Sequence, residues 1–409
     1  MPAKITLKGS KSITNRALLL AYLTKLQTGK PTKLKNIGEC DDTSHMQQGL
    51  KKLATKSPGK IHLGNAGTAV RFLTALATVS NKDVTITGCK RMKERPIKPL
   101  TETLNRLGAK ITTSSSGCLP LHIKTSTLKG GTVQIPGNIS SQYISALLMT
   151  APLMVEKGLK LHLTGEVFSK PYIEMTIKLM KKFGIKVEKT SSFKTLKVAP
   201  NQKFKNPVDN KLFIEGDASS ASYLGAYAAL KPETLVTIAG IPQKSIQGDI
   251  AFTSYLRKMG CKVTHTNTEI TIQGPKTLKP LGEIDMNKTP DLVMTFAVLS
   301  AFANGITKIT NIANLRIKES DRISVLKNEF TKLGIKVKAG KDYIEIKGNP
   351  SLTLQHKRTT IKTYNDHRIA MAFGVLKKTV LPRLRIEKPS VVRKSYPEFW
   401  SDLNLLNRN

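Results

Sequence analysis

A helical segment that ends in glycine and continues into a short alternating strand recurs four times in this chain. The four copies span residues 104–112, 179–188, 256–264 and 330–338. Successive glycines are 76, 76 and 74 residues apart, at Gly108, Gly184, Gly260 and Gly334. Glycine after a helix adopts the left-handed conformation without a Cβ clash, and the Ile/Val alternation that follows predicts a strand. One copy is common in α/β proteins, but four at near-constant spacing predict a repeated unit of about 75 residues, five or six to the chain.

Composition limits the class of protein. The chain has 409 residues, of which 39% are hydrophobic and 23% charged, which fits about two or three globular domains. It carries 66 Lys and Arg against 28 Asp and Glu, a net charge of +38 that is spread over both halves. Such a charge attracts anions, namely nucleic acid, acidic lipid or small phosphorylated and carboxylated substrates. Solvated surface lysines account for the same charge without any function.

Cysteine usage and hydropathy indicate the compartment. Four widely spaced cysteines form no CxxC pair, so we expect neither a disulfide framework nor a zinc or other metal site. No apolar run reaches 18 residues, and the N-terminus enters an alternating segment rather than a signal peptide. These features predict a soluble cytoplasmic protein without a membrane span.

Local signals predict several element boundaries. Residues 133–135 alternate like a strand, and Ser140 or Ser141 could cap the apolar run that follows. Ser169, followed by a lysine and a proline, predicts the start of another helix. The polar, Lys- and Pro-containing stretches 190–211 and 273–290 are interpreted as loops between repeat units.

Three segments of the N-terminal half could bind anions. In the first, Lys11, Ser12 and Arg16 stand in a small-residue turn that enters an apolar helix. The second is a glycine-rich loop that carries Asn65, Gly67, Thr68 and Arg71, and the third is a charged run that contains Arg95. Backbone N–H groups at a helix start favour anions, and neighbouring cations strengthen that preference. Capped helices with solvated cations explain these segments equally well.

Hydroxyl and amide groups at two further helix starts suit a small polar ligand. They belong to Ser140, Ser141, Gln142, Ser169 and Tyr172. The C-terminal half supplies the remaining ionisable and amide candidates, which are Asp291, Asn314, Lys318, Glu319, Arg322, His367, Arg368 and Lys394. An ion-pair ladder along one helix would also account for Lys318, Glu319 and Arg322.

Taken together, these segments resemble the 5-enolpyruvylshikimate-3-phosphate synthase family. The resemblance runs from about Lys4 to Trp400 and is carried by ten motifs in family order, among them GSKSITNRALLL, LGNAGTAVRFL, LRIKESDR, YNDHRIAMAF and RKSYPEFW. It implies an inside-out α/β barrel of two domains, each built from three βαβαββ units with pseudo-threefold symmetry. One domain would be residues 10–215 and the other residues 1–9 plus 216–409, with the active site in a cleft that closes between them.

The reaction that the resemblance implies transfers the enolpyruvyl group of phosphoenolpyruvate to the 5-hydroxyl of shikimate 3-phosphate. Phosphoenolpyruvate would be bound by Lys11, Gly67, Arg95, Gln142, Arg322, Arg368 and Lys394. Shikimate 3-phosphate would be bound by Lys11, Ser12, Arg16, Ser140, Ser141, Gln142, Ser169, Asp291, Asn314 and Lys318. Asp291 would accept the proton of the attacking hydroxyl, and Glu319 or Lys11 would deliver a proton to the methylene carbon. Supporting roles would fall to Asn65, Thr68, Arg71, Tyr172 and His367. A monomer with no cofactor is expected.

Two other functions agree with part of the sequence. The enolpyruvyl transferase family that acts on UDP-N-acetylglucosamine shares the fold, but it has a loop cysteine five residues before the arginine that matches Arg95, where this chain has Lys90. A basic nucleic-acid-binding protein would suit the charge. Aromatic residues make up only 5% of the chain, however, and no RNA-binding or zinc motif is present, so no specific nucleic acid partner is expected.

Overall fold

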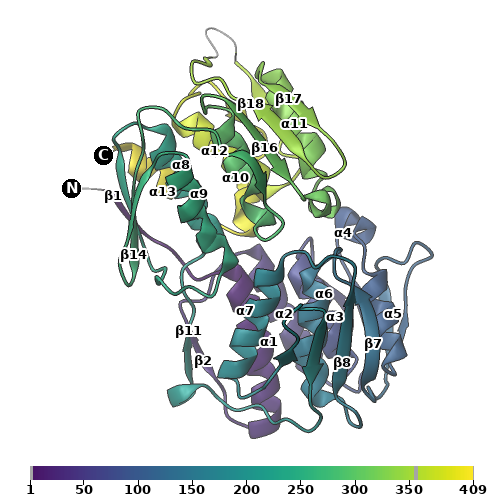
Figure 1. The fold of residues 1–409 in the computed structure, drawn as a ribbon. Coiled ribbons are helices and arrows are strands. Elements are labelled where there is room, and N and C mark those ends of the chain that lie inside the picture. Colours follow the sequence, from purple (N-terminus) through teal and green to yellow (C-terminus); the bar gives the residue numbers. More distant parts are fainter. Residues whose placement is uncertain (1–2, 354–357, 409) are drawn as a thin grey trace. The chain divides into compact units, whose positions relative to one another are not determined.

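The computed structural model describes residues 3–353 and 358–408. The chain divides into two compact units, which are described separately: unit 1 comprises Met1–Ser10 and Glu215–Asn409, and unit 2 comprises Lys11–Ile214. Both units are mixed α/β structures (Figure 1).

Unit 2 contains three sheets. The first has the strand order β3 (Gly59–His62), β4 (Val84–Thr87), β6 (Leu121–Lys124), β5 (Lys110–Thr112). The second has the order β7 (Gly131–Pro136), β8 (Leu159–Thr164), β10 (Thr195–Val198), β9 (Glu188–Lys189). The third pairs β2 (Lys33–Lys35) with β11 (Lys211–Phe213). The helices of unit 2 are α1 (Lys11–Thr28), α2 (Asp41–Ala54), α3 (Gly67–Ala77), α4 (Lys90–Glu94), α5 (Lys98–Arg106), α6 (Ser141–Thr150) and α7 (Lys170–Lys182). Unit 2 also contains the short 3₁₀ turns η1 (Ala151–Leu153) and η2 (Val208–Asn210).

Unit 1 repeats this plan. Its sheets are β1 (Ala3–Thr6), β12 (Leu235–Ala239), β14 (Glu269–Gln273), β13 (Lys262–His265); β15 (Gly282–Asp285), β16 (Ile306–Thr310), β18 (Ile344–Lys347), β17 (Lys336–Ala339); and β19 (Thr360–Ile361), β20 (Arg385–Ile386). Its helices are α8 (Ala218–Leu230), α9 (Phe252–Lys258), α10 (Val293–Ser300), α11 (Arg322–Lys332), α12 (His367–Lys378) and α13 (Phe399–Arg408). The 3₁₀ turns are η3 (Gly248–Ala251), η4 (Pro290–Leu292), η5 (Ala313–Ile317) and η6 (Pro389–Lys394).

The four-stranded sheets share one topology, which confirms the repeat predicted from sequence. In each sheet the first two strands are parallel, and the next two pair antiparallel. The same holds in unit 1. All four repeat glycines follow a helix with φ between +76° and +110° and lead into β5, β9, β13 and β17. Within the described residues, the remaining sheet of each unit has only two strands, so the repeat is reduced there.

Helices rather than strands occupy the centre of each unit. In unit 1 every residue of α10 is buried, and so are all but one residue of α8 and the first ten residues of α12. A helix that is apolar on all sides needs packing partners on all sides, and these three pack against one another with the sheets around them (Figure 1). The strands alternate buried and exposed residues, as expected for sheets with one face on the core. The predicted inside-out α/β class is therefore confirmed.

Two sequence interpretations need correction. The stretches 190–211 and 273–290, interpreted as loops, contain β10 and the first residue of β11, and the last residue of β14 and all of β15. These strands are only three to five residues long and contain many lysine and polar residues. So few residues do not show a clear alternation of apolar and polar side chains. The predicted strand at 133–135 and the helices that follow Ser140 and Ser169 are present as β7, α6 and α7.

A buried carboxylate fixes the segment that enters α12. Glu329 on α11 is fully buried, and both of its oxygens lie 2.7 Å from Nζ of Lys332. It also accepts hydrogen bonds from the backbone N–H of Lys362, at 3.1 Å, and from the Tyr364 hydroxyl, at 3.0 Å. These bonds connect α11 to the residues just ahead of α12.

We expect Glu329→Ala to lower the free energy of unfolding by roughly 3 kcal/mol, because it removes the buried carboxylate that accepts from Lys332, Lys362 and Tyr364. Glu283→Ala is the control, because the Glu283 side chain is 64% exposed in its ion pair with Lys308 and should contribute less than about 1 kcal/mol. Urea unfolding followed by the fluorescence of Trp400, the single tryptophan, reports on unit 1. Equal losses in both variants would contradict the role assigned to Glu329.

Candidate active site

Lys11 is the first residue of α1, and its ammonium is held in place by an acidic residue of the next helix. Its Nζ lies 2.8 Å from Oδ2 of Asp42, which is buried in the first turn of α2. The Lys11 side chain is 13% exposed, so it is confined yet still reaches solvent. The ion pair fixes a cation at the start of a helix, where the backbone N–H groups also favour an anion.

Arg16 is buried among helices instead of projecting into solvent. Its guanidinium donates to Oγ1 of Thr176, the carbonyl of Ser12, Oγ of Ser145 and the carbonyl of Tyr172, at 2.6, 2.8, 3.3 and 3.2 Å. It also lies 5.3 Å from the centre of the Phe72 ring. Burial lowers its pKa to about 10, which leaves it charged at neutral pH. These bonds join the start of α1 to α6 and α7 and thereby fix Ser12 and Tyr172.

Two guanidinium groups converge on the start of α3. A Cβ atom at Gly67 would lie 2.9 Å from Nη1 of Arg95 and 3.1 Å from Nη1 of Arg71. Arg71 itself is held by the carbonyls of Gly67 and Pro96, at 3.2 and 2.9 Å. Only glycine leaves room at this point for both cations to approach the backbone. The loop can therefore present backbone N–H groups and two cations to one anion.

The start of α6 is joined to the same loop. The amide of Gln142 donates to Oγ1 of Thr68 at 3.1 Å, and Ser140 caps α6 by accepting from the Gln142 backbone N–H at 3.3 Å. Ser141 is buried beside them, and Asn65 lies in the loop just ahead of Gly67. Next to them, the Tyr143 hydroxyl donates to the carbonyl of Pro96. The structure thus brings together the glycine-rich loop, the charged run and the serine pair that sequence treated as separate segments.

Ser169 starts α7 in an unusual backbone conformation. It has φ +56° and ψ +38°, the left-handed region that L-residues other than Asn and Asp seldom adopt, and it is buried. The carbonyl of Tyr172, one turn further on, accepts the hydrogen bond from Arg16. Strain of this kind is often found where a side chain must be aimed at a ligand.

Arg322 is the centre of the charged cluster in unit 1. Its side chain is 1% exposed, and its Nε lies 2.8 Å from Oδ2 of Asp366. Its terminal nitrogens lie 3.0 Å from Oε2 of Glu319 and 3.3 Å from Oδ1 of Asp291. Burial by itself lowers the pKa of Arg322, but the three carboxylates raise it well above its usual value. The guanidinium is therefore permanently charged and orients three acidic groups.

Asp291 is shared between Arg322 and a second guanidinium. Nη2 of Arg368 lies 2.6 Å from Oδ2 of Asp291, and Nη1 of Arg368 contacts the Tyr223 hydroxyl at 3.4 Å. The Asp291 side chain is 22% exposed, more than any other carboxylate of this cluster. Two cations favour its ionised form. Asp291 is thus a carboxylate fixed by two arginines that can still meet a ligand.

Glu319 connects Arg322 to Lys394, whose Nζ lies 3.4 Å from Oε1 of Glu319. Both side chains are about one-tenth exposed. Arg322, Arg368 and Lys394 are thus matched by the carboxylates Asp291, Glu319 and Asp366. Each of these three cations therefore contacts at least one carboxylate.

Other predicted residues of unit 1 lie on neighbouring segments. Asn314 is buried in η5, and within the described chain its Oδ1 has no hydrogen-bond partner. Lys318 follows η5 and is half-buried. His367 begins α12 and is buried, with Nδ1 3.7 Å from Oδ1 of Asp366.

Sequence reasoning did not identify four residues that lie near the candidate site residues of the two units. They are Asp42, Tyr223, Asp249 and Asp366. Asp366 caps α12 through the backbone N–H of Arg368, and an aspartate directly before a helical run is a signal that could have identified this cap. Asp249 is fully buried and accepts a hydrogen bond from Ser219. Burial, together with the nearby charge of Asp291, raises its pKa to about 7.

The described residues, 3–353 and 358–408, contain neither a metal-binding cluster nor a membrane-spanning helix. No group of three or more His, Cys, Asp or Glu side chains in this part of the chain is arranged to hold a metal ion. No helix there combines the length and the apolar character needed to cross a bilayer. The four cysteines are free.

Sequence comparison places this architecture among known enzymes. The sequence model of the EPSP synthase (3-phosphoshikimate 1-carboxyvinyltransferase) family matches residues 1–403. The 3-phosphoshikimate 1-carboxyvinyltransferase of Actinobacillus pleuropneumoniae serotype 5b is 41% identical, covering 99% of this chain and 96% of the relative. The one from Haemophilus influenzae (strain PittEE) is 42% identical over 97% and 95%, and the chloroplastic one from Arabidopsis thaliana is 38% identical over 99% and 82%.

The fold agrees with solved structures. An EPSP synthase from Acinetobacter baumannii superposes with a TM-score of 0.76 at 22% identity, covering 98% of this chain and 94% of that chain. A second structure of EPSP synthase from Acinetobacter baumannii gives a TM-score of 0.74 at 21% identity with the same coverage. At this level of identity the structural likeness supports the fold, and the sequence relatives establish the family. The chain belongs to the EPSP synthase (3-phosphoshikimate 1-carboxyvinyltransferase) family.

Proposed function

We propose that this chain transfers the enolpyruvyl group of phosphoenolpyruvate to the 5-hydroxyl of shikimate 3-phosphate and releases phosphate, a step of chorismate and aromatic amino acid biosynthesis. The observation that carries the proposal is the position of Asp291, bonded to both Arg322 and Arg368. A carboxylate in this position can accept the proton of a hydroxyl, while the two guanidinium groups stabilise an anionic donor. The same arginines can hold the carboxylate or phosphate of phosphoenolpyruvate.

The proposed reaction proceeds by addition and elimination. Asp291 accepts the proton of the 5-hydroxyl while the oxygen of that hydroxyl bonds to the central carbon of phosphoenolpyruvate. The methylene carbon gains a proton in the same addition. The resulting tetrahedral ketal phosphate then loses phosphate and a methyl proton to restore the double bond. Two proton-transfer groups are therefore needed, and Asp291 supplies the first.

Glu319 and Lys11 are the candidates for the second proton transfer. Glu319 contacts Arg322 and Lys394, two cations that favour its ionised form, so a bound anion would have to offset them before Glu319 could donate. Lys11 carries a proton at neutral pH but is paired with Asp42. Glu319 lies in the charged cluster of unit 1, and Lys11 lies at the start of α1 in unit 2. We propose both as candidates for delivering the proton to the methylene carbon.

For substrate binding, we propose that unit 2 holds phosphoenolpyruvate through Lys11, Arg95 and the backbone at Gly67, with Gln142 beside it. Arg322, Arg368 and Lys394 serve the same substrate from unit 1. The convergence of Arg95 and Arg71 on Gly67 supports this set. Asn65, Thr68, Arg71, Tyr172 and His367 are proposed to support the binding groups.

Shikimate 3-phosphate is proposed to bind Lys11, Ser12, Ser140, Ser141, Gln142, Ser169, Asp291, Asn314 and Lys318. The buried Oδ1 of Asn314, without a partner in the described chain, is the kind of acceptor that a ligand hydroxyl satisfies. Arg16 is proposed to act in this set mainly by fixing Ser12 and Tyr172, since its guanidinium donates four hydrogen bonds to protein acceptors.

The remaining proposals concern organisation. We propose that unit 2 and unit 1 are the two domains expected for residues 10–215 and for residues 1–9 plus 216–409, and that both clusters serve one reaction. A monomer in the cytoplasm that needs no cofactor is likewise proposed.

Phosphate release from phosphoenolpyruvate tests the reaction directly. We expect release with shikimate 3-phosphate and none with UDP-N-acetylglucosamine. Release only with UDP-N-acetylglucosamine would favour the related transferase. No release with either acceptor, together with salt-resistant binding of nucleic acid, would favour the nucleic-acid-binding alternative.

We predict that Asp291→Asn lowers kcat by about 10²–10⁴, because it removes a general base. Titration calorimetry should show that shikimate 3-phosphate still binds within about tenfold of wild type. A kcat near that of wild type would remove Asp291 from the role of base.

We predict that Gly67→Ala raises KM for phosphoenolpyruvate by about tenfold. The added methyl group would lie 2.9 Å from Nη1 of Arg95 and displace that guanidinium, and a tenfold change corresponds to about 1.4 kcal/mol of binding energy. Initial rates at varied concentrations of each substrate should show KM for shikimate 3-phosphate changing less than about twofold. Equal changes in both constants would indicate a general disturbance of the fold.

We predict that the raised pKa of Asp249 makes the free energy of unfolding depend on pH. Its pKa is raised from 3.8 to about 7 in the folded protein, so the stability that its proton contributes is complete below about pH 4 and is lost as pH rises to 7. Asp249→Asn cannot ionise, so between pH 5 and pH 8 it should gain on the order of 2 kcal/mol relative to wild type. Urea unfolding followed by Trp400 fluorescence measures the difference. The same difference at both pH values would contradict the shift.

A further inference from the structure

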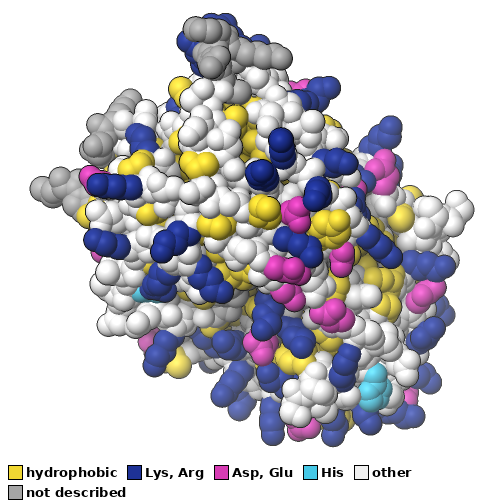
Figure 2. All heavy atoms as spheres, turned by 45° about the horizontal axis from the view of Figure 1, so that its top comes forward, with side chains coloured by type: hydrophobic (Ala, Val, Ile, Leu, Met, Phe, Trp, Pro, Cys, Tyr) yellow, Lys and Arg dark blue, Asp and Glu magenta, His cyan; other side chains and the backbone are white. Residues whose placement is uncertain are grey.

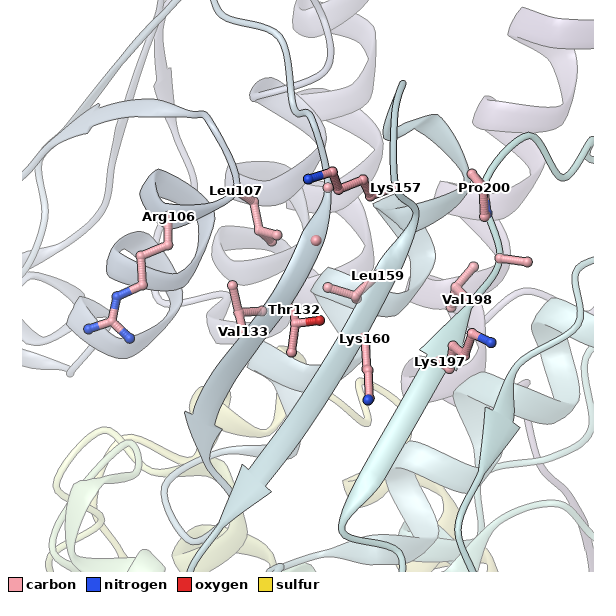
Figure 3. A pocket seen from close by; sticks show the side chains of 13 residues that line it. Arg106, Leu107, Thr132, Val133, Lys157, Leu159, Lys160, Lys197, Val198 and Pro200 are labelled. Atoms are coloured by element: carbon pink, nitrogen blue, oxygen red, sulfur yellow. The ribbon is translucent and has the colours of Figure 1, made fainter.

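Unit 2 contains a cavity that is separate from every residue of the candidate site. It has a volume of about 430 Å³ and lies where α5 ends and where β7 and β8 begin (Figure 3). Four of its thirteen lining residues are cationic, and none is acidic. The cations are Arg106, Lys157, Lys160 and Lys197, and we call this cavity the basic cavity.

The strand register brings two of these cations side by side. Lys160 on β8 is the direct antiparallel partner of Lys197 on β10, and both side chains are exposed on the outer face of the sheet. Like charges directly opposite each other destabilise a strand pair. Figure 3 shows the charged ends of the cations pointing in different directions, as mutual repulsion favours, although each is carried on a flexible stem.

Ion pairs leave most of this charge unbalanced. Within the described chain, no carboxylate forms an ion pair with Arg106, Lys157 or Lys160. Lys197 lies 3.9 Å from Oε2 of Glu188, and that carboxylate is shared with Lys186 at 3.8 Å. One acidic group at the edge of the sheet therefore faces several cations.

The repeated fold provides an internal comparison. In the sheet of unit 1 with the same topology, the equivalent row across the strands reads Glu283, Lys308, Glu345, Lys338, with every neighbour oppositely charged. In the basic cavity's sheet the same row reads Thr132, Lys160, Lys197, Glu188. In the two remaining four-stranded sheets the row holds a single lysine, Lys60 or Lys4, and no adjacent pair of cations. The fold therefore does not require two adjacent lysines at this position.

We propose that the basic cavity binds a small polyanion that carries two or more adjacent phosphate groups. The volume is within the range of ligand pockets, and both Lys and Arg bind phosphate oxygens well. A ligand with neighbouring negative charges would relieve the repulsion between Lys160 and Lys197 and draw in Lys157. Free inorganic polyphosphate and a nucleoside polyphosphate share this chemistry.

A long nucleic acid fits these observations less well. None of the residues that line the cavity is aromatic, so no stacking platform for bases is present. Figure 2 shows Lys and Arg side chains scattered over the visible face instead of gathered in one continuous track. The feature that distinguishes the basic cavity is a partly open volume combined with adjacent cations.

The test compares two double variants that remove the same charge. Lys160→Ala with Lys197→Ala removes the adjacent pair, and Lys336→Ala with Lys347→Ala removes another directly opposed lysine pair that does not line the cavity. Binding of inorganic triphosphate and of ATP is measured by titration calorimetry at 150 mM salt. We expect the first variant to lose at least tenfold in affinity for both probes and the second to lose less than twofold. Enolpyruvyl transfer should stay within twofold of wild type in both variants, since none of the four lysines belongs to the candidate site.

Several results would overturn the proposal. They are the absence of saturable binding of either probe to wild type, equal losses in the two variants, or binding that only oligonucleotides show. Hydrogen exchange locates the probe: protection by triphosphate should appear at residues 130–133 and 157–160. Protection confined to residues 65–68 would assign the phosphate to the candidate site instead. If the first variant fails to fold, Lys157→Ala with Arg106→Ala gives the same test on the other two cations.

Discussion

A buried guanidinium needs acceptors for its N–H groups, and at Arg322 carboxylates supply them. The arrangement of unit 1 follows from this pairing. With its side chain 1% exposed, Arg322 would be very costly without partners, and it takes Asp366, Glu319 and Asp291 from three different segments. Asp366 at the same time caps α12, which places Arg368 at the start of that helix and in contact with Asp291. Glu329, bonded to Lys362 and Tyr364, fixes the chain just ahead of this cap. The position of the candidate base is thus a consequence of pairing buried charges.

Unit 2 solves a different electrostatic problem. Its buried Arg16 and Arg71 are held largely by backbone carbonyls and hydroxyl groups, which orient a cation without cancelling its charge. In unit 1 the three cations are matched by three carboxylates, so the cluster orients groups rather than accumulating positive charge. The two clusters therefore suit different tasks. Unit 2 keeps positive charge that can attract anions, and unit 1 fixes the carboxylate of Asp291 between two arginines.

The repeat could be predicted from the sequence because it depends on local signals, and the class of fold followed from the resemblance to the family. A glycine after a helix and an alternating strand are visible in any window, as at Gly184 and Gly334, and both have the positive φ that the signal implies. The partners of the candidate residues were not predictable in this way. Asp42, Tyr223 and Asp249 lie far along the chain from Lys11, Arg368 and Asp291, and only the packing of helices brings them together. The burial of Arg16 was missed for the same reason, since nothing in a run of residues at a helix start tells a solvated arginine from one enclosed by α6 and α7.

The repeat also explains where sequence can vary without harm. Inward-facing positions of each sheet, such as Leu161 on β8 and Ile309 on β16, are buried and must stay apolar for the helices to pack. The outward row of the same strands has no such constraint, and it carries alternating charges in one sheet and adjacent lysines in another. Because the topology is the same, the difference between these rows cannot arise from the demands of folding. Charged side chains that the fold does not require are free to serve ligand binding. With a net charge of +38, this chain has many such side chains.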